Sequence, residues 1–196
     1  MKAKLSHLPA ICVAVLLLCI FSSLCGAASA STTLIKFKYS PFPYKEPANS
    51  EKPFFDVIEQ GRRGHTSLRG GVYWEDERYK DNRVLISIPS HFKRSKPAII
   101  VVYLHGNLAT LERDVLDRQG IPEQIAASGL NAILLAPQFA LDALDSSPGH
   151  FADENFFEKF LVEAANKAGK WKKNKRLAES LKNAQVIIVA YSGGYQ

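Results

Sequence analysis

After residue 30, three stretches are apolar without interruption, namely Ala98–Leu104, Ala132–Ala136 and Val186–Tyr191. None of them alternates apolar with polar side chains. A strand buried on both faces of a parallel sheet has this pattern, so we predict a buried strand at each. The sequence between these stretches carries helical signals, at Leu108–Gln119, Pro122–Ser128 and Arg176–Leu181. Pro122 suits a first helical turn, and Gly129 suits a helix end.

A longer helix is expected after Asp153, whose carboxylate can cap it. Its apolar side chains recur at helical spacing on one face: Phe156, Phe157, Phe160, Leu161 and Ala164. Earlier in the chain, Gly71–Trp74 and Val84–Ile88 are predicted to be strands that pair antiparallel. Strands that alternate with helices predict an α/β fold with a mainly parallel sheet and flanking helices.

Residues 31–70 show little apolar periodicity and are rich in Pro, Lys and Arg. We interpret them as an extended lead-in with little structure of its own. The folded domain is therefore expected over residues 71–196, and residues 1–30 have a different character.

The first thirty residues have the order of a secretory signal peptide. Lys2 and Lys4 precede an apolar run from Ile11 to Leu24, and Ala28-Ser29-Ala30 supplies an A-x-A cleavage site. An uncleaved membrane anchor is the alternative, although the apolar run is short for a bilayer. A lipid anchor is disfavoured, because leucine precedes both Cys19 and Cys25. We expect cleavage after Ala30, export to the periplasm or the medium, and no stable membrane insertion afterwards.

The charge and the cysteine content exclude few classes of function. All three cysteines lie before residue 30, and loss of Lys2 and Lys4 lowers the formal net charge from +6 to +4. This mild charge supports no nucleic-acid partner. The run from Lys170 to Arg176 holds five basic residues, which suit either contact with an anionic lipid or acidic partner, or a solvated helix junction.

Two loops follow buried strands at their carboxyl ends, where open α/β sheets place their sites. The first is Tyr103-Leu104-His105-Gly106-Asn107, and the second is Ala190-Tyr191-Ser192-Gly193-Gly194. A serine between a strand and small residues fits a strained turn that exposes a nucleophile, and an ordinary Ser-Gly-Gly turn remains the alternative. A His-Gly pair after a buried strand fits a donor of oxyanion hydrogen bonds.

Together, "VVYLHGN" and "VIIVAYSGGY" make the chain resemble the α/β-hydrolase family, as its third strand with oxyanion loop and its fifth strand with nucleophile elbow. The resemblance covers Gly71 to Gln196. It implies Ser192 as nucleophile, with backbone N–H groups of Gly193 and of Gly106 or Asn107 as the oxyanion hole. His105 would support the loop rather than act as the base. No metal or organic cofactor is implied.

Two features depart from the family pattern. Ala190 replaces a glycine two places before the serine, and the family order places the acid and the histidine after Ser192, where four residues follow. The chain is therefore expected to be the front part of a longer hydrolase, truncated after the fifth strand. Two upstream alternatives are His150 as base, and a metal site from Asp142, Asp145, His150 and Asp153, although this spacing matches no ligand template.

The predicted function is that of an exported serine hydrolase acting on a small ester or related acyl substrate through Ser192. Because no catalytic acid or histidine is assigned in this chain, the 196 residues alone are expected to be nearly inactive. The alternative is a non-catalytic hydrolase-like binding protein or an inactive gene remnant.

Overall fold

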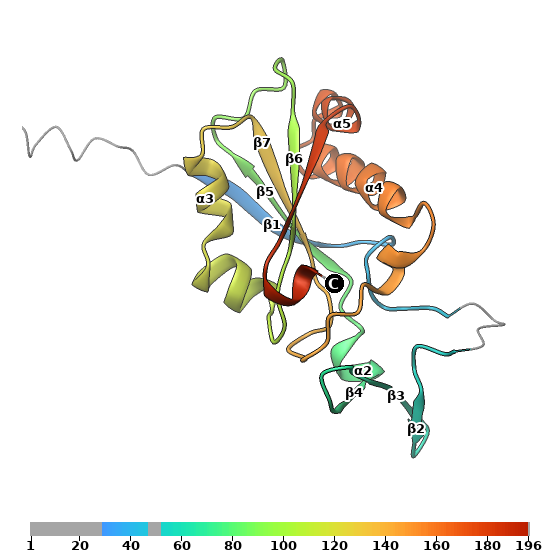
Figure 1. The fold of residues 1–196 in the computed structure, drawn as a ribbon. Coiled ribbons are helices and arrows are strands. Elements are labelled where there is room, and N and C mark those ends of the chain that lie inside the picture. The colour runs from blue at the N-terminus through green and yellow to red at the C-terminus, as the bar shows by residue number, and fades with distance from the viewer. Residues whose placement is uncertain (1–28, 47–51, 196) are drawn as a thin grey trace, which may run out of the picture.

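In the computed structural model, which describes residues 29–46 and 52–195, most of the chain packs around one five-stranded sheet (Figure 1). The strands lie in the order β1-β5-β7-β6-β8. Their bounds are Ala30–Lys36 for β1, Arg83–Pro89 for β5, Ile99–Leu104 for β6, Ala132–Pro137 for β7 and Gln185–Ala190 for β8. The proposed leader lies largely outside the described residues, apart from Ser29 and Ala30.

The sheet is mixed. β6 pairs in parallel with β7 and with β8, whereas β5 pairs antiparallel with both β1 and β7. The expected α/β class is therefore confirmed, and the expectation of a mainly parallel sheet is corrected. The parallel strands β6, β7 and β8 are joined through helices along the chain, because a parallel strand pair needs a long crossover connection.

Layers of helices cover both faces of this sheet (Figure 1). The helix α4 (Phe156–Trp171) and the helix α5 (Lys175–Lys182) pack on one face, through residues such as Phe160 and Leu177. The π-helix η1 (Leu111–Arg118) and the helix α3 (Ile121–Ala127) cover the other face, where Leu111 and Val115 are fully buried. Burial on both faces accounts for the unbroken apolar runs of β6 and β7. The expected burial of the third run is wrong, because β8 is the outer strand of the described sheet and most of its residues are exposed.

The segment before residue 71 is more ordered than a lead-in. Ser31–Lys36 belong to β1 and pair with β5 along its length. A second, three-stranded sheet in the described part consists of β2 (Val57–Glu59), β3 (Arg62–Thr66) and β4 (Val72–Trp74). The predicted pairing of Gly71–Trp74 with Val84–Ile88 is wrong, because β4 pairs with β3.

Ion pairs hold this small sheet to the short helix α2 (Glu75–Arg78). Arg62 contacts both Asp76 and Glu77, and Arg63 contacts Glu75 at 2.6 Å. The polar pattern that suggested an unstructured segment therefore belongs to strands whose arginines face a row of acids.

The predicted helices form with small shifts in their ends. α4 begins after Asn155 and not after an Asp153 cap, and Asp153 instead binds His150. The Asn174 side chain caps α5 by accepting from the Leu177 N–H at 3.1 Å, and the Thr110 hydroxyl does the same for η1. No helix in residues 29–46 and 52–195 has the length and apolarity to cross a membrane.

Candidate functional site

The two loops singled out in the sequence lie side by side at one end of the main sheet. β6 and β8 are parallel neighbours, with Leu104 opposite Ala190, so their carboxyl ends meet at the same edge. The Tyr191 N–H donates to the Leu104 carbonyl at 3.0 Å and continues the pairing into the turn. The fold thus brings His105–Asn107 against Ser192–Gly194.

Ser192 sits in a strained turn. Its φ is +51°, in the left-handed region that non-glycine residues seldom adopt. The chain turns there from β8 into the short 3₁₀ helix η3 (Ser192–Tyr195), and the serine is exposed. A strained, exposed residue at a strand end is a feature of functional turns and of nucleophile elbows in particular.

Small residues are required around this serine. A Cβ on Gly106 would lie 2.9 Å from the Cβ of Ser192, so the first loop touches the elbow directly. A Cβ on Gly194 would lie 2.5 Å from the Leu104 carbonyl oxygen, and one on Gly193 would collide with the Asn107 amide. All three glycines therefore permit a close approach between the loops.

Backbone donors at the first loop are free to bind a ligand. Within the described part of the chain, the N–H groups of Gly106 and Asn107 donate to no protein acceptor. Gly106 is buried, and a buried N–H without a partner is uncommon in native structures. The next residue, Leu108, also has a positive φ of 57°, so strain extends along this loop.

The Asn107 side chain fastens the loop to its neighbours. With its amide nitrogen turned toward Asp145, it donates to the Asp145 carbonyl at 3.1 Å and to Ser146 Oγ at 2.9 Å. Its amide oxygen then accepts from Arg69 Nε at 3.2 Å. Asn107 thereby joins the two strand-end loops to the segment around Asp145.

His105 is a structural histidine in this arrangement. Its Nε2 accepts from the Phe139 N–H at 3.0 Å, so the proton lies on Nδ1, which donates to the Gly106 carbonyl at 2.8 Å. Burial lowers the pKa of His105, against smaller opposing effects of the Gly106 hydrogen bond and the charge of Asp114. A neutral ring with both nitrogens engaged supports the loop and is unavailable as a base.

Gln138 completes this support, although no motif in the sequence pointed to it. The side chain is fully buried at the end of β7, where Nε2 donates to His105 Nε2 at 2.9 Å and to the Ala109 carbonyl at 3.2 Å. Its Oε1 accepts from the Leu111 N–H at 3.0 Å. The sequence signal for this role was a polar residue directly after a buried strand, because an amide side chain that is buried there needs hydrogen-bond partners.

A cavity of about 370 Å³ lies beside the elbow. Gly193, Gly194 and the first loop form its polar side, and Ser192 itself does not line it. Its apolar wall consists of Leu104, Phe139, Pro148, Phe151, Phe157 and Ile188. Its volume and mixed lining suit a small ligand with an apolar portion.

The upstream histidine considered as a base is committed elsewhere. His150 Nδ1 bonds Asp153 at 2.6 Å, and its Nε2 accepts from the Lys45 N–H at 3.0 Å. Its ring stacks on Phe156, with centroids 4.6 Å apart. Among the described residues, no hydrogen bond joins a histidine to Ser192.

The four residues considered as a metal site are also dispersed. Asp142 faces Arg78 and Arg113, whereas buried Asp145 accepts from the Tyr79 hydroxyl at 2.7 Å. His150 and Asp153 pair with each other. Residues 29–46 and 52–195 contain no group of three or more His, Cys, Asp or Glu arranged to hold a metal ion.

Comparison of the sequence with known protein families and with curated proteins found no match. The fold and the site define an α/β protein in which a strained serine turn packs on a His-Gly loop.

Proposed function

We propose that this chain carries the nucleophile and oxyanion portion of a serine hydrolase of the α/β-hydrolase type. The observation that carries the proposal is the conformation of Ser192, exposed with a φ of +51° at the carboxyl end of β8 and packed on Gly106. Strain at this non-glycine residue, between the outer strand β8 and two required glycines, has no evident role in stability.

The chain order of the strands also supports this resemblance. β6 and β8 are the third and fifth strands of the main sheet in chain order, and the family motif assigns the oxyanion loop and the elbow to those strands. β7 lies on the far side of β6, which leaves β6 and β8 adjacent. The Ala190 substitution is compatible with the turn, since alanine adds one methyl group to a half-buried position.

In the proposed reaction, Ser192 Oγ attacks the carbonyl carbon of an ester and its proton passes to a base. The resulting oxyanion accepts hydrogen bonds from the Gly193 N–H and from the Gly106 or Asn107 N–H. The C–O bond then breaks, the alcohol leaves with a proton, and water hydrolyses the acyl-enzyme to the acid. The apolar wall of the 370 Å³ cavity is suited to a small acyl group. The mechanism needs no metal or organic cofactor.

The proposal assigns the base to a residue outside the described part of the chain, because no described histidine forms a hydrogen bond with Ser192. The family order, with acid and histidine after the serine, agrees with this requirement. Translation of the DNA beyond the codon for Gln196 tests it directly. An in-frame acid and histidine about a hundred residues later would favour the enzyme, and a true stop codon would favour a remnant.

A non-catalytic binding protein is the second candidate, and the same lack of a base contact favours it. Hydrolysis of p-nitrophenyl butyrate distinguishes the two. The 196-residue chain should be nearly inactive, because loss of a triad histidine costs roughly 10⁶-fold in rate. Added imidazole can replace a missing base, so it should raise a rate that Ser192→Ala abolishes. A Ser192-dependent rate that is already high without imidazole would mean that an upstream residue acts as the base.

Export is part of the proposal and rests on the order of charged, apolar and small residues before Ser31. Cleavage after Ala30 would leave Ser31–Lys36 of β1 paired with β5. N-terminal sequencing of the protein from the periplasm or medium should give Ser31 as the first residue. An intact Met1 on soluble cytoplasmic protein would contradict export. A small ester or acyl compound is the proposed partner, and neither a nucleic acid nor stable membrane insertion is proposed.

A further inference from the structure

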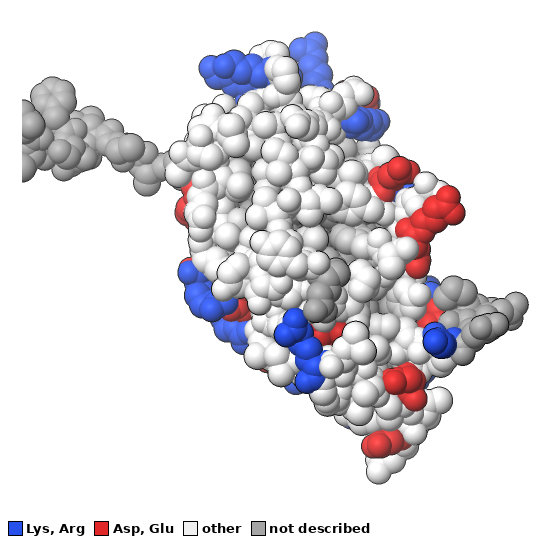
Figure 2. Space-filling model, in the orientation of Figure 1, with Lys and Arg blue, Asp and Glu red and all other residues white. Residues whose placement is uncertain are grey.

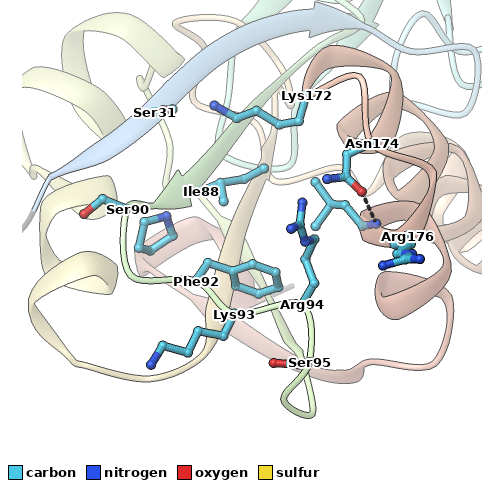
Figure 3. A pocket seen from close by; sticks show the side chains of 12 residues that line it. Ser31, Ile88, Ser90, Phe92, Lys93, Arg94, Ser95, Lys172, Asn174 and Arg176 are labelled. Atoms are coloured by element: carbon cyan, nitrogen blue, oxygen red, sulfur yellow. Dashed lines mark hydrogen bonds between the residues drawn. The ribbon is translucent and has the colours of Figure 1, made fainter.

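We propose that the hollow between α5 and the β5–β6 connection binds a small organic anion that carries a phosphate-like group. The hollow, shown in Figure 3, has a volume of about 780 Å³. It lies at the end of the main sheet where β6 begins, whereas the Ser192 turn lies at the end where β6 stops. Its walls come from the start of β1, residues 88–95, the turn after α4 and the start of α5. The proposal is independent of the hydrolase assignment.

Four cationic side chains surround this hollow, and no acidic residue lines it. They are Lys93, Arg94, Lys172 and Arg176. Two of the five basic residues in the run noted in the sequence thus lie beside two from a loop about eighty positions earlier. Figure 2 shows Lys and Arg gathered at the top of the view, over α5 and the β5–β6 connection.

These four cations lack carboxylate partners within the described part of the chain. Elsewhere, Arg62, Arg83 and Arg113 each contact two carboxylates. The four cations around the hollow are therefore not neutralised by an acid of the described part, although several other basic residues there also lack a carboxylate partner. Like charges around one hollow repel each other, and a bound anion would remove that repulsion.

Hydrogen-bond donors at the hollow are also uncommitted. In the described residues, the hydroxyls of Ser31, Ser90 and Ser95 have no protein partner. The N–H groups of Lys175 and Arg176 open α5 and have no acceptor within the helix, since the Asn174 cap serves Leu177. The positive end of the helix dipole adds to the attraction for an anion.

The positions of the side chains indicate an organic ligand rather than a bare ion. Figure 3 shows Arg94 reaching toward Asn174, and Lys172 extending across the hollow toward Ser31. Ile88, Phe92 and Leu177 supply apolar surface between these cations. A phosphate group could meet Arg94 and Lys172 while a ring or short chain rests on Phe92.

Titration of the 196-residue chain with 1-naphthyl phosphate and with inorganic pyrophosphate, by calorimetry, tests the proposal. Binding of the naphthyl compound is expected with a Kd at or below roughly 1 mM. Arg94→Gln combined with Lys172→Gln should weaken it by about 10-fold or more, because charge-assisted hydrogen bonds are lost. Lys173→Gln combined with Lys175→Gln is the matched control, since it removes two charges from the same basic run outside the hollow.

A second arm uses vesicles of phosphatidylglycerol and of phosphatidylcholine, because a lipid headgroup presents the same phosphate chemistry. Binding to the anionic vesicles that depends on Arg94 and Lys172, without binding of 1-naphthyl phosphate, would assign the site to a lipid headgroup. The proposal is overturned if neither source of phosphate binds. It is also overturned if the Lys173 and Lys175 control weakens binding as much as the Arg94 and Lys172 pair.

Discussion

Replacement of Gln138 by leucine should destabilise the protein strongly while leaving its volume nearly unchanged. The Leu111 N–H would lose its acceptor at 3.0 Å and remain buried, which costs about 1–3 kcal/mol. The Ala109 carbonyl and His105 Nε2 would each lose one of two partners, because Asp142 and Phe139 still donate to them. We therefore expect a total loss of about 2–4 kcal/mol.

Urea unfolding followed by circular dichroism measures this loss. For a slope of about 2 kcal/mol per M, the midpoint should fall by about 1–2 M. Gln124→Leu is the matched control, because Gln124 is exposed and donates one hydrogen bond to the Gln119 carbonyl. Its effect should stay within about 0.5 kcal/mol. If Gln138→Leu changed stability as little as the control, the proposed support of the first loop through His105 and Leu111 would be refuted.

Three further predictions concern charge, backbone and edge. Burial keeps His105 neutral in the folded protein, whereas the same side chain in the unfolded chain takes up a proton below about pH 6.5. The free energy of unfolding should therefore fall below that pH by up to about 1.4 kcal/mol per pH unit. The fall should be smaller in His105→Gln, which has no proton to take up at this position. Gly149→Ala should lower the free energy of unfolding, measured by thermal unfolding, by at least about 2 kcal/mol, because the φ of Gly149 is +55° and a Cβ would overlap the Pro41 carbonyl. Gly129→Ala is the control and should lower it by about 1 kcal/mol, because the space around Gly129 is open. Ile188 is 55% exposed on β8, the outer strand of the described sheet, so we expect copies of the chain to associate through this edge. Ile188→Lys should reduce that self-association in sedimentation, and unchanged association would exclude this edge as its cause.

The central strands were predictable because burial on both faces leaves a distinct pattern. This holds for β6 and β7, which are largely buried, whereas β8 was predicted to be buried and is instead an outer strand with mostly exposed residues. The parallel pairing of β6 with β8 put His105 and Ser192 at one edge. That the two loops meet followed from topology alone.

The strands and the side chain that the sequence did not predict depend on partners distant in sequence. β1 is half-buried and includes Ser31, Thr32 and Thr33, so only its pairing with β5 makes it a strand. β3 is polar and depends on the acids of α2. Gln138 gave no motif, because its role follows from three groups that the fold brings to it.

The central claim is that Ser192 is a nucleophile held in a strained elbow beside oxyanion donors. The most direct measurement is the reaction of the 196-residue chain with a fluorophosphonate, followed by mass-spectrometric mapping of the adduct, with and without imidazole. We predict slow labelling at Ser192 that imidazole accelerates and that Ser192→Ala removes, without adducts at Ser146 or Ser147 close by. Adducts spread over several serines, or no adduct at Ser192 even with imidazole, would contradict the claim.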